Sequence, residues 1–261
     1  MNIFFIGDIV GKPGLELALS LIPNYVRKFE VDLLIVNGEN TTDGKGISAD
    51  DAKKVFDAGA HVITTGNHVW DRWDSRKVMK ADRRILRPLN YPRENGGNGF
   101  IVVDLGEKGK VGVVNAQGRV YMQAIDDPFK GVDRVIAKIR EETKVVVVDF
   151  HADATAEKMC MGWYLDGKVT AVLGTHTHTP TADARILPRG TAFQSDVGMT
   201  GPYDSVLGMQ KEQALRRILL ATPHKYEVAT HDVRLCAAFV KADPSTGRAL
   251  KMESIIFPAF G

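Results

Sequence analysis

An alternation of short apolar strands with helices along the first third of the chain limits its fold more than any other sequence feature. Residues 2–6, 31–36 and 61–64 are mostly apolar runs that end near glycine or polar residues, which is typical of buried strands. Residues 15–29 show helical periodicity with a kink or break at Pro23, and Ser48 is the expected N-cap of a helix that ends near residue 58. Repeated strand–helix–strand units of this kind predict a mostly parallel sheet.

The rest of the chain adds further strands and helices. Residues 100–105 and 110–114 resemble an antiparallel pair, and residues 144–150 and 169–173 are expected to be buried strands. Helices are expected at residues 133–142 and 207–220, and the last two strands at residues 232–241 and 250–257. The sequence contains no internal repeat and no long linker. We therefore expect an α/β fold with a single domain over residues 1–261, in which two mixed β-sheets pack face to face between flanking helices.

The composition excludes several classes of protein. The 261 residues are 44% hydrophobic and 25% charged, which is ordinary for a globular chain. Because 34 Lys and Arg nearly balance 32 Asp and Glu, we expect no general nucleic-acid-binding face and no membrane partner. Two cysteines make neither a disulfide framework nor a cysteine-based zinc site, and the N-terminus does not resemble a signal peptide. These features predict a cytoplasmic location.

Polar side chains that can bind metal or exchange protons follow the predicted core strands. In open α/β sheets, the carboxyl ends of the strands lie at one edge and build the active site. We therefore expect these residues to meet at one edge: Asp8, Glu39, Asn40, Asn67, His68, Asp149, His151, Asp153, His176 and His178.

Two histidine patterns are more specific than the others. His176 and His178 follow a buried strand two residues apart, and in extended backbone both imidazoles would face one side and clamp a first-row metal. His151 has Asp149 and Asp153 two residues away on either side, where a carboxylate would accept the ring N–H and orient the histidine.

Each of these residues also has an ordinary interpretation when it is taken alone. Asp8 is typical of a turn or a helix cap, and Glu39 of a solvated loop. The two neighbouring histidines would be ordinary in an exposed loop, and Asp153 could simply cap a helix that starts near Ala154. The metal interpretation rests on the repetition of such residues at successive strand ends.

These segments, in their order along the chain, resemble the motifs of the calcineurin-like metallophosphoesterases, and most closely those of the YmdB-like branch. The matching segments are Gly7-Asp8-Ile9-Val10-Gly11, Asn37-Gly38-Glu39-Asn40, Gly66-Asn67-His68-Val69-Trp70-Asp71, Asp149-Phe150-His151-Ala152 and Gly174-Thr175-His176-Thr177-His178. Residues 115–119 and 198–202 are similar too, so the resemblance covers nearly the whole chain and implies the αββα sandwich of that superfamily. Val10 stands where the wider superfamily has a histidine, and Glu39 replaces its second aspartate, as is usual in the YmdB-like branch.

The resemblance implies a site for two metal ions that share Glu39. The first set of ligands would be Asp8, Glu39, Asn40 and His178, and the second set Glu39, Asn67, His151 and His176. Two divalent cations facing two carboxylates would keep a positive charge that attracts a phosphate ester, and would supply hydroxide near neutral pH. We expect attack by metal-bound hydroxide, with His68 donating a proton to the leaving oxygen and Asp71 orienting His68.

The ligand types and the resemblance together predict an activity. Imidazole, carboxylate and amide ligands without thiolates suit iron or manganese, with zinc or nickel as alternatives. The resemblance implies a metal-dependent phosphoric ester hydrolase, a phosphodiesterase or phosphatase, with 2′,3′-cyclic nucleotides and aryl phosphates as candidate substrates. The expected partner is thus a small nucleotide or another phosphodiester, and the sequence leaves a homo-oligomer open.

Two other functions stay open at this point. A mononuclear metal hydrolase would need fewer ligands than the seven candidates above, and one metal ion per chain would favour it. A regulatory protein that senses a nucleotide with little turnover would use the same residues. Tight binding without hydrolysis would favour that function.

Overall fold

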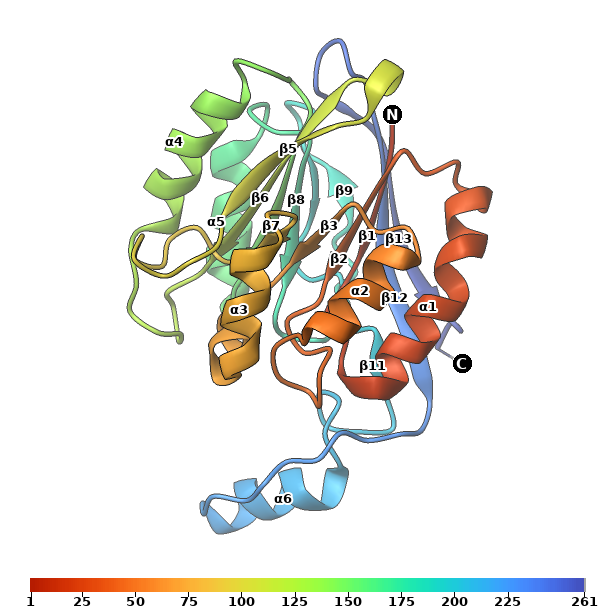
Figure 1. The fold of residues 1–261 in the computed structure, drawn as a ribbon, viewed down its shortest axis with the longest axis vertical. Coiled ribbons are helices and arrows are strands. Elements are labelled where there is room, and N and C mark those ends of the chain that lie inside the picture. The colour runs from red at the N-terminus through yellow and green to blue at the C-terminus, as the bar shows by residue number, and fades with distance from the viewer. Residues whose placement is uncertain (261) are drawn as a thin grey trace.

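Two β-sheets lie face to face between two layers of helices in the computed structural model, which describes residues 1–260 (Figure 1). The expected sandwich of two mixed sheets with flanking helices is therefore confirmed. None of the helices in the described part of the chain is both long and apolar enough to cross a membrane.

The first sheet combines N-terminal and C-terminal strands. Its members are β1 (Asn2–Ile6), β2 (Leu33–Asn37), β3 (Val62–Thr64), β4 (Ile85–Leu86), β11 (Gly201–Pro202), β12 (Val233–Ala242) and β13 (Ala249–Phe257). The order is β11-β12-β1-β2-β3-β4, and β13 pairs with β12. Strands β1 to β4 run parallel, whereas β12 is antiparallel to both β1 and β13.

The second sheet is built from the middle of the chain. Its members are β5 (Phe100–Asp104), β6 (Lys110–Gln117), β7 (Val146–His151), β8 (Ala171–Thr175), β9 (Arg185–Ile186) and β10 (Ala192–Gln194). The order is β5-β6-β7-β8-β10-β9, with parallel pairs between β6, β7, β8 and β10. The edge strands β5 and β9 are antiparallel to their neighbours, as the sequence predicts for β5 and β6.

Helices cover the outer faces of both sheets. The first sheet is covered by α1 (Gly11–Lys28), α2 (Ala49–Asp57) and α3 (Trp73–Ala81), and the second by α4 (Pro128–Ile139) and α5 (Thr155–Leu165). The helix α6 (Lys211–Leu220) projects away from the sandwich, at the bottom of Figure 1. Two short 3₁₀ helices, η1 (Asn67–Asp71) and η2 (Gly106–Lys108), complete the structure.

Strand β1 shows how the layers form from a period-2 pattern. Ile3 and Phe5 lie in the core between the two sheets, whereas Phe4 and Ile6 pack under the helices of the first sheet. Because successive strand residues face opposite sides, a continuous apolar run is what a strand buried on both faces requires. Strand β1 therefore contributes both to the core between the sheets and to the layer under the helices.

Several helix boundaries differ from the sequence prediction. Helix α1 begins at Gly11 rather than residue 15, and its first turn includes Gly14, which packs so closely on the Thr200 carbonyl that no side chain would fit there. Pro23 lies inside this one helix and does not split it, since the flanking apolar residues are held against the sheet.

Two later helices also begin at unexpected residues. Helix α4 starts at Pro128 rather than residue 133, and the Asp127 carboxylate caps it by accepting the Phe129 N–H at 2.9 Å. Helix α6 starts at Lys211 rather than residue 207. The N-cap predicted at Ser48 is confirmed, since its hydroxyl accepts the Asp51 N–H at 3.1 Å.

Candidate functional site

The carboxyl ends of β1, β2, β3, β7 and β8 meet at one edge of the sandwich and bring the candidate residues together. Two groups of atoms there are arranged as a metal ion would need them. One group consists of Asp8, Glu39 and His178, and the other of Glu39, His151 and His176. Within each group, the ligand atoms lie within 4.8 Å of one another, and Glu39 belongs to both.

Two amides lie beside these groups. Asn40 Nδ2 lies 3.1 Å from His178 Nε2 and donates to Glu39 Oε1 at 3.1 Å. Asn67 Oδ1 lies 3.1 Å from His151 Nε2. Each amide thus lies next to the group to which the resemblance assigns it.

Buried oxygen atoms provide a test of whether these residues fit a metal ion. Asp8 Oδ1 and Asn40 Oδ1 are buried, and neither accepts a hydrogen bond from any residue between 1 and 260. Burying a polar atom without a partner is costly, so such atoms are rare. A cation beside them would satisfy both oxygens, and the mixed nitrogen and oxygen donors suit a first-row transition metal. The residues present therefore fit a metal ion.

The protonation states of two of the three histidines favour metal binding. Burial lowers the pKa of His176 to about 3, and the neighbouring His151 adds to the effect. Burial also lowers the pKa of His178. Both rings are therefore neutral at pH 7 and can offer a nitrogen lone pair to a metal.

The carboxylates and His151 form a tightly coupled group. Burial would raise the pKa of Glu39, but the charge and the hydrogen bond of His151 outweigh it and hold the pKa well below its usual range. For His151 the directions are reversed. Burial would lower its pKa, but Glu39 raises the pKa to about 9. Burial raises the pKa of Asp8 well above its ordinary value, against the effect of His151. Ligation through His151 Nε2 would therefore require the loss of one proton.

At Nδ1, the ring of His151 contacts a threonine rather than Asp149 or Asp153 directly, which corrects the sequence prediction. Its Nδ1 lies 2.9 Å from Thr175 Oγ1, and that hydroxyl donates to Asp149 Oδ1 at 2.7 Å. The other oxygen of Asp149 accepts the Asn37 amide at 2.9 Å. Asp153 does not contact His151 and instead lies 3.7 Å from His176 Nε2. Asp149 therefore acts through Thr175, because the two residues lie on neighbouring strands with their side chains on one side.

We expect the substitution Thr175→Val to weaken metal binding without unfolding the protein. Valine keeps the shape of threonine but removes the hydroxyl that links His151 to Asp149. Loss of a residue that orients a metal ligand lowers metal affinity by about 10–100-fold. Titration of the metal-free protein with Mn²⁺ would measure this change. Thr175→Ser restores the hydroxyl and should restore most of the affinity, whereas equal affinities of wild type and Thr175→Val would contradict the relay.

His176 and His178 reach the site through left-handed backbone, not through the extended backbone that the sequence predicts. Strand β8 ends at Thr175, and φ is +95° at His176 and +63° at His178. Such angles are uncommon for residues other than glycine, so surrounding contacts must stabilise them.

A buried ion pair supplies these contacts. The Asp196 carboxylate accepts the Thr177 N–H at 3.0 Å and the Thr177 hydroxyl at 2.6 Å, and pairs with Lys158 Nζ at 2.7 Å. Lys158 and Asp196 are 2% and 1% exposed, so the pair is screened from water. Neither residue was singled out from the sequence, since nothing in the segments around them marks an approach to the histidines.

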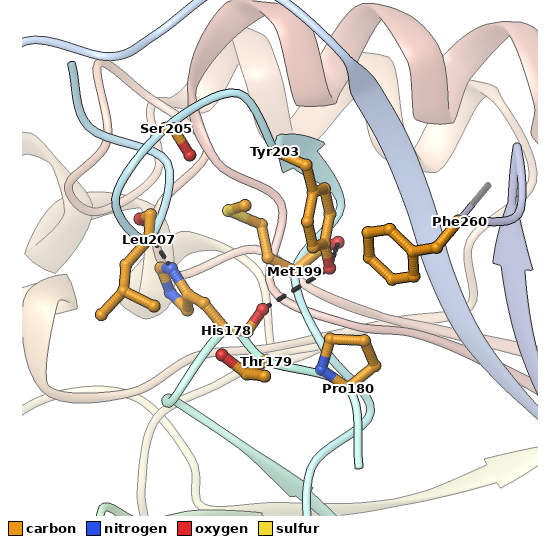
Figure 2. Close-up of a pocket in the computed structure, with 8 residues that line it drawn as sticks. All are labelled: His178, Thr179, Pro180, Met199, Tyr203, Ser205, Leu207 and Phe260. Carbon is orange, nitrogen blue, oxygen red and sulfur yellow. Dashed lines mark hydrogen bonds between the residues drawn. The ribbon is translucent and has the colours of Figure 1, made fainter. Parts of the chain in front are cut away.

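A backbone carbonyl binds the ring nitrogen of His178 that points away from Asn40. His178 Nδ1 donates to the Leu207 carbonyl at 3.0 Å, which leaves Nε2 to face Asn40 and Asp8. Figure 2 shows this contact at the wall of a cavity of about 270 Å³, whose other side chains include Met199, Tyr203 and Phe260.

His68 lies beside the two groups rather than within them. Its backbone N–H donates to Glu39 Oε2 at 3.2 Å, while its ring nitrogen Nδ1 lies 2.9 Å from Asp71 Oδ2. The expected contact with Asp71 is thus present, and Lys45 Nζ lies 3.3 Å from the same carboxylate oxygen. With a side chain 35% exposed, His68 can reach a bound ligand from the solvent side.

Gly66 makes room for this arrangement. A Cβ atom at this position would overlap the carboxylate of Glu39 and the ring of His151. The backbone after β3 therefore passes directly over the site and leads into η1, which carries Asn67 and His68.

Comparison with known proteins identifies the family. Residues 4–255 match the family model described as YmdB-like protein. The chain is 41% identical over 256 residues to the 2′,3′-cyclic-nucleotide 2′-phosphodiesterase of Bacillus subtilis (strain 168), across 98% of this chain and 97% of that protein. It is similar to the crystal structure of a hypothetical protein from Thermus thermophilus, with a TM-score of 0.92 and 37% identity over 98% of this chain and 99% of that one. The structure of a novel phosphatase from Mycoplasma pneumoniae matches with a TM-score of 0.93 and 34% identity over 98% and 93% of the two chains. The chain therefore belongs to the family of YmdB-like proteins.

Proposed function

We propose that the protein is a di-metal phosphodiesterase that hydrolyses 2′,3′-cyclic nucleotides. The observation that carries this proposal is the pair of groups that share Glu39, in which every residue except His176 is buried. The name of the Bacillus subtilis relative, which is similar over nearly the full length of both chains, supports the substrate class. The same evidence supports one catalytic domain over residues 1–261.

The proposed ligands divide into two sets around Glu39. The first metal would be held by Asp8, Glu39, Asn40 and His178, and the second by Glu39, Asn67, His151 and His176. Iron or manganese suits these donors best, with zinc or nickel as alternatives. A pair of such ions supplies Lewis-acid polarisation of the phosphoryl oxygens and lowers the pKa of bound water.

The side chains of the chain itself orient the substrate and move protons. In the hydrolysis, oxygen from water bonds to phosphorus, the bond from phosphorus to the 2′-oxygen breaks, and a 3′-phosphate remains. His68 would give a proton to the departing oxygen, and Asp71, whose Oδ2 lies 2.9 Å from His68 Nδ1, would hold the ring from that nitrogen. The attacking water would lose one proton to solvent and His68 would afterwards regain one from solvent, so the proton count balances. Asp8 and Glu39, both fully buried, would supply the carboxylate charge that holds the two cations.

The direct test is turnover of 2′,3′-cyclic AMP and of a bis-aryl phosphate with Mn²⁺ or Fe²⁺, with and without a chelator. We expect hydrolysis of both substrates, loss of activity with the chelator, and two metal ions per chain by elemental analysis. One metal ion per active chain would favour a mononuclear hydrolase instead. Tight nucleotide binding without product would favour a nucleotide sensor.

A further inference from the structure

A second cavity opens beside Asn67, and it shares no lining residue with the cavity at His178. Its volume is about 670 Å³, which lies in the range of small-molecule sites, whereas the cavity at His178 has about 270 Å³. Three segments line it: the turn from Asn67 into helix α3, the loop around Tyr91, and residues 123–126. We propose that this cavity holds the nucleobase of the cyclic nucleotide, an inference that rests on the proposed function.

The position of the cavity matches the leaving side of the reaction. Asn67 and Asp71 both line it. Asn67 Oδ1 contacts His151 at 3.1 Å, and Asp71 contacts His68 at 2.9 Å. A nucleotide with its phosphate at the metal groups and its 2′-oxygen at His68 therefore extends its base toward this cavity.

Aromatic rings form one wall of the cavity. Trp70 packs on Tyr91 with ring centroids 4.9 Å apart, and both residues line the cavity. Aromatic side chains stack on nucleobases, and each stacked base adds markedly to binding.

Carboxamides provide the polar edge that a base needs. Asn95 and Gln123 both line the cavity. The Tyr91 hydroxyl lies 3.0 Å from Gln117 Oε1 and 3.5 Å from Gln123 Oε1. Its single proton is therefore donated to Gln117, the nearer acceptor. The Gln123 amide can therefore offer a donor and an acceptor side by side, as carboxamides do for the edge of adenine.

The charge of the cavity favours a neutral group over a second phosphate. Asp71 and Asp126 bring two carboxylates to the lining, and Arg76 brings one guanidinium. The lining thus carries one more negative than positive charge, which repels a phosphate but not a base.

The cavity at His178 is less suited to a base. Its polar groups are already engaged within the chain, since the Tyr203 hydroxyl donates to the Met199 carbonyl at 3.0 Å and the Leu207 carbonyl accepts from His178 (Figure 2). Its remaining lining includes Pro180, Met199 and Phe260. We therefore assign the base to the cavity beside Asn67 and not to this one.

The test changes the lining of one cavity at a time and compares the kinetics of two substrates. Ala124→Trp places an indole in the proposed cavity from an exposed position, and Gln123→Ala removes the free amide. Phe260→Ala, which opens the His178 cavity, is the matched control. The substrates are 2′,3′-cyclic AMP and glycerol 1,2-cyclic phosphate, which has the same five-membered cyclic phosphate and no base.

We expect Ala124→Trp and Gln123→Ala to raise the KM for 2′,3′-cyclic AMP by about tenfold, with little change in kcat. The kinetics of glycerol 1,2-cyclic phosphate should stay unchanged in both variants, and Phe260→Ala should leave both substrates unaffected. Equal losses on both substrates, no change in either variant, or a nucleotide-specific loss in Phe260→Ala would overturn the assignment.

Equilibrium binding separates this inference from the proposed function. If the wild type hydrolyses neither cyclic phosphate, the proposed function fails, but calorimetry with 2′,3′-cyclic AMP still tests the cavity. A Kd about tenfold weaker in Ala124→Trp than in Phe260→Ala would support the assignment. Equal Kd values in the two variants would overturn it.

Discussion

Substitution of the shared carboxylate, Glu39→Gln, should lower the hydrolysis of 2′,3′-cyclic AMP by about 10³-fold or more. Glutamine has the shape of glutamate, but it removes the negative charge that both ligand groups share. It also places an amide nitrogen next to groups that now donate to the carboxylate, the Asn40 amide at 3.1 Å and the His68 N–H at 3.2 Å. Kinetic assays and elemental analysis of the purified variant measure the two effects, and we expect fewer than one metal ion per chain.

Glu157→Gln is a matched control for this variant. Glu157 is also buried, at 8% exposure, but its carboxylate accepts the N–H groups of Arg119 and Val120 rather than facing the site. It should therefore keep its metal and its activity, even if it unfolds at a lower temperature. Wild-type metal content and turnover in Glu39→Gln would contradict the shared role of this residue.

The second large effect is expected from His68→Ala, which should keep its metal but lose catalysis on poor leaving groups. A positioned proton donor contributes about 10²–10⁴-fold, so we expect a loss of that size in kcat for 2′,3′-cyclic AMP. An activated aryl phosphate leaves without a proton, and its hydrolysis should change little. Metal content, measured on the same samples, should equal that of the wild type because His68 lies outside both ligand groups.

His231→Ala is the control, since His231 is exposed and far along the chain from the site residues. Asp71→Asn should show a milder loss in the same pattern, because it weakens the contact that holds His68 at 2.9 Å. A loss of equal size on the activated and the unactivated substrate would argue against proton donation by His68.

Local sequence patterns were enough to predict the layers of the fold. The apolar runs at β1 and β2 and the Ser48 cap are encoded within a few residues, and the structure has each of them. The first turn of α1 was missed because Gly11 and Gly14 are typical of a loop. Gly14 packs closely against the Thr200 carbonyl and Gly11 against the Val228 side chain, and both of these partners lie far along the chain.

The grouping of the candidate ligands was also predictable, because parallel strands bring their carboxyl ends to one edge. The reasons for their orientation were not. Sequence neighbours suggested that Asp149 and Asp153 would contact His151, whereas the contact comes from Thr175, 24 residues away. The extended geometry expected for His176 and His178 was wrong, since a strand that ends at Thr175 no longer imposes its alternation on the residues beyond it.

The sequence by itself determined which side chains stand at the strand ends, because strand period and turn chemistry are local properties of the chain. Only the tertiary structure decided how those side chains point. The Lys158–Asp196 pair that supports the histidine loop joins residues 38 positions apart, and the Asn37–Asp149 hydrogen bond joins residues 112 positions apart. The cavity beside Asn67 likewise combines three separate segments. Contacts of this kind form only when distant segments of the chain pack together, so no local sequence pattern predicts them.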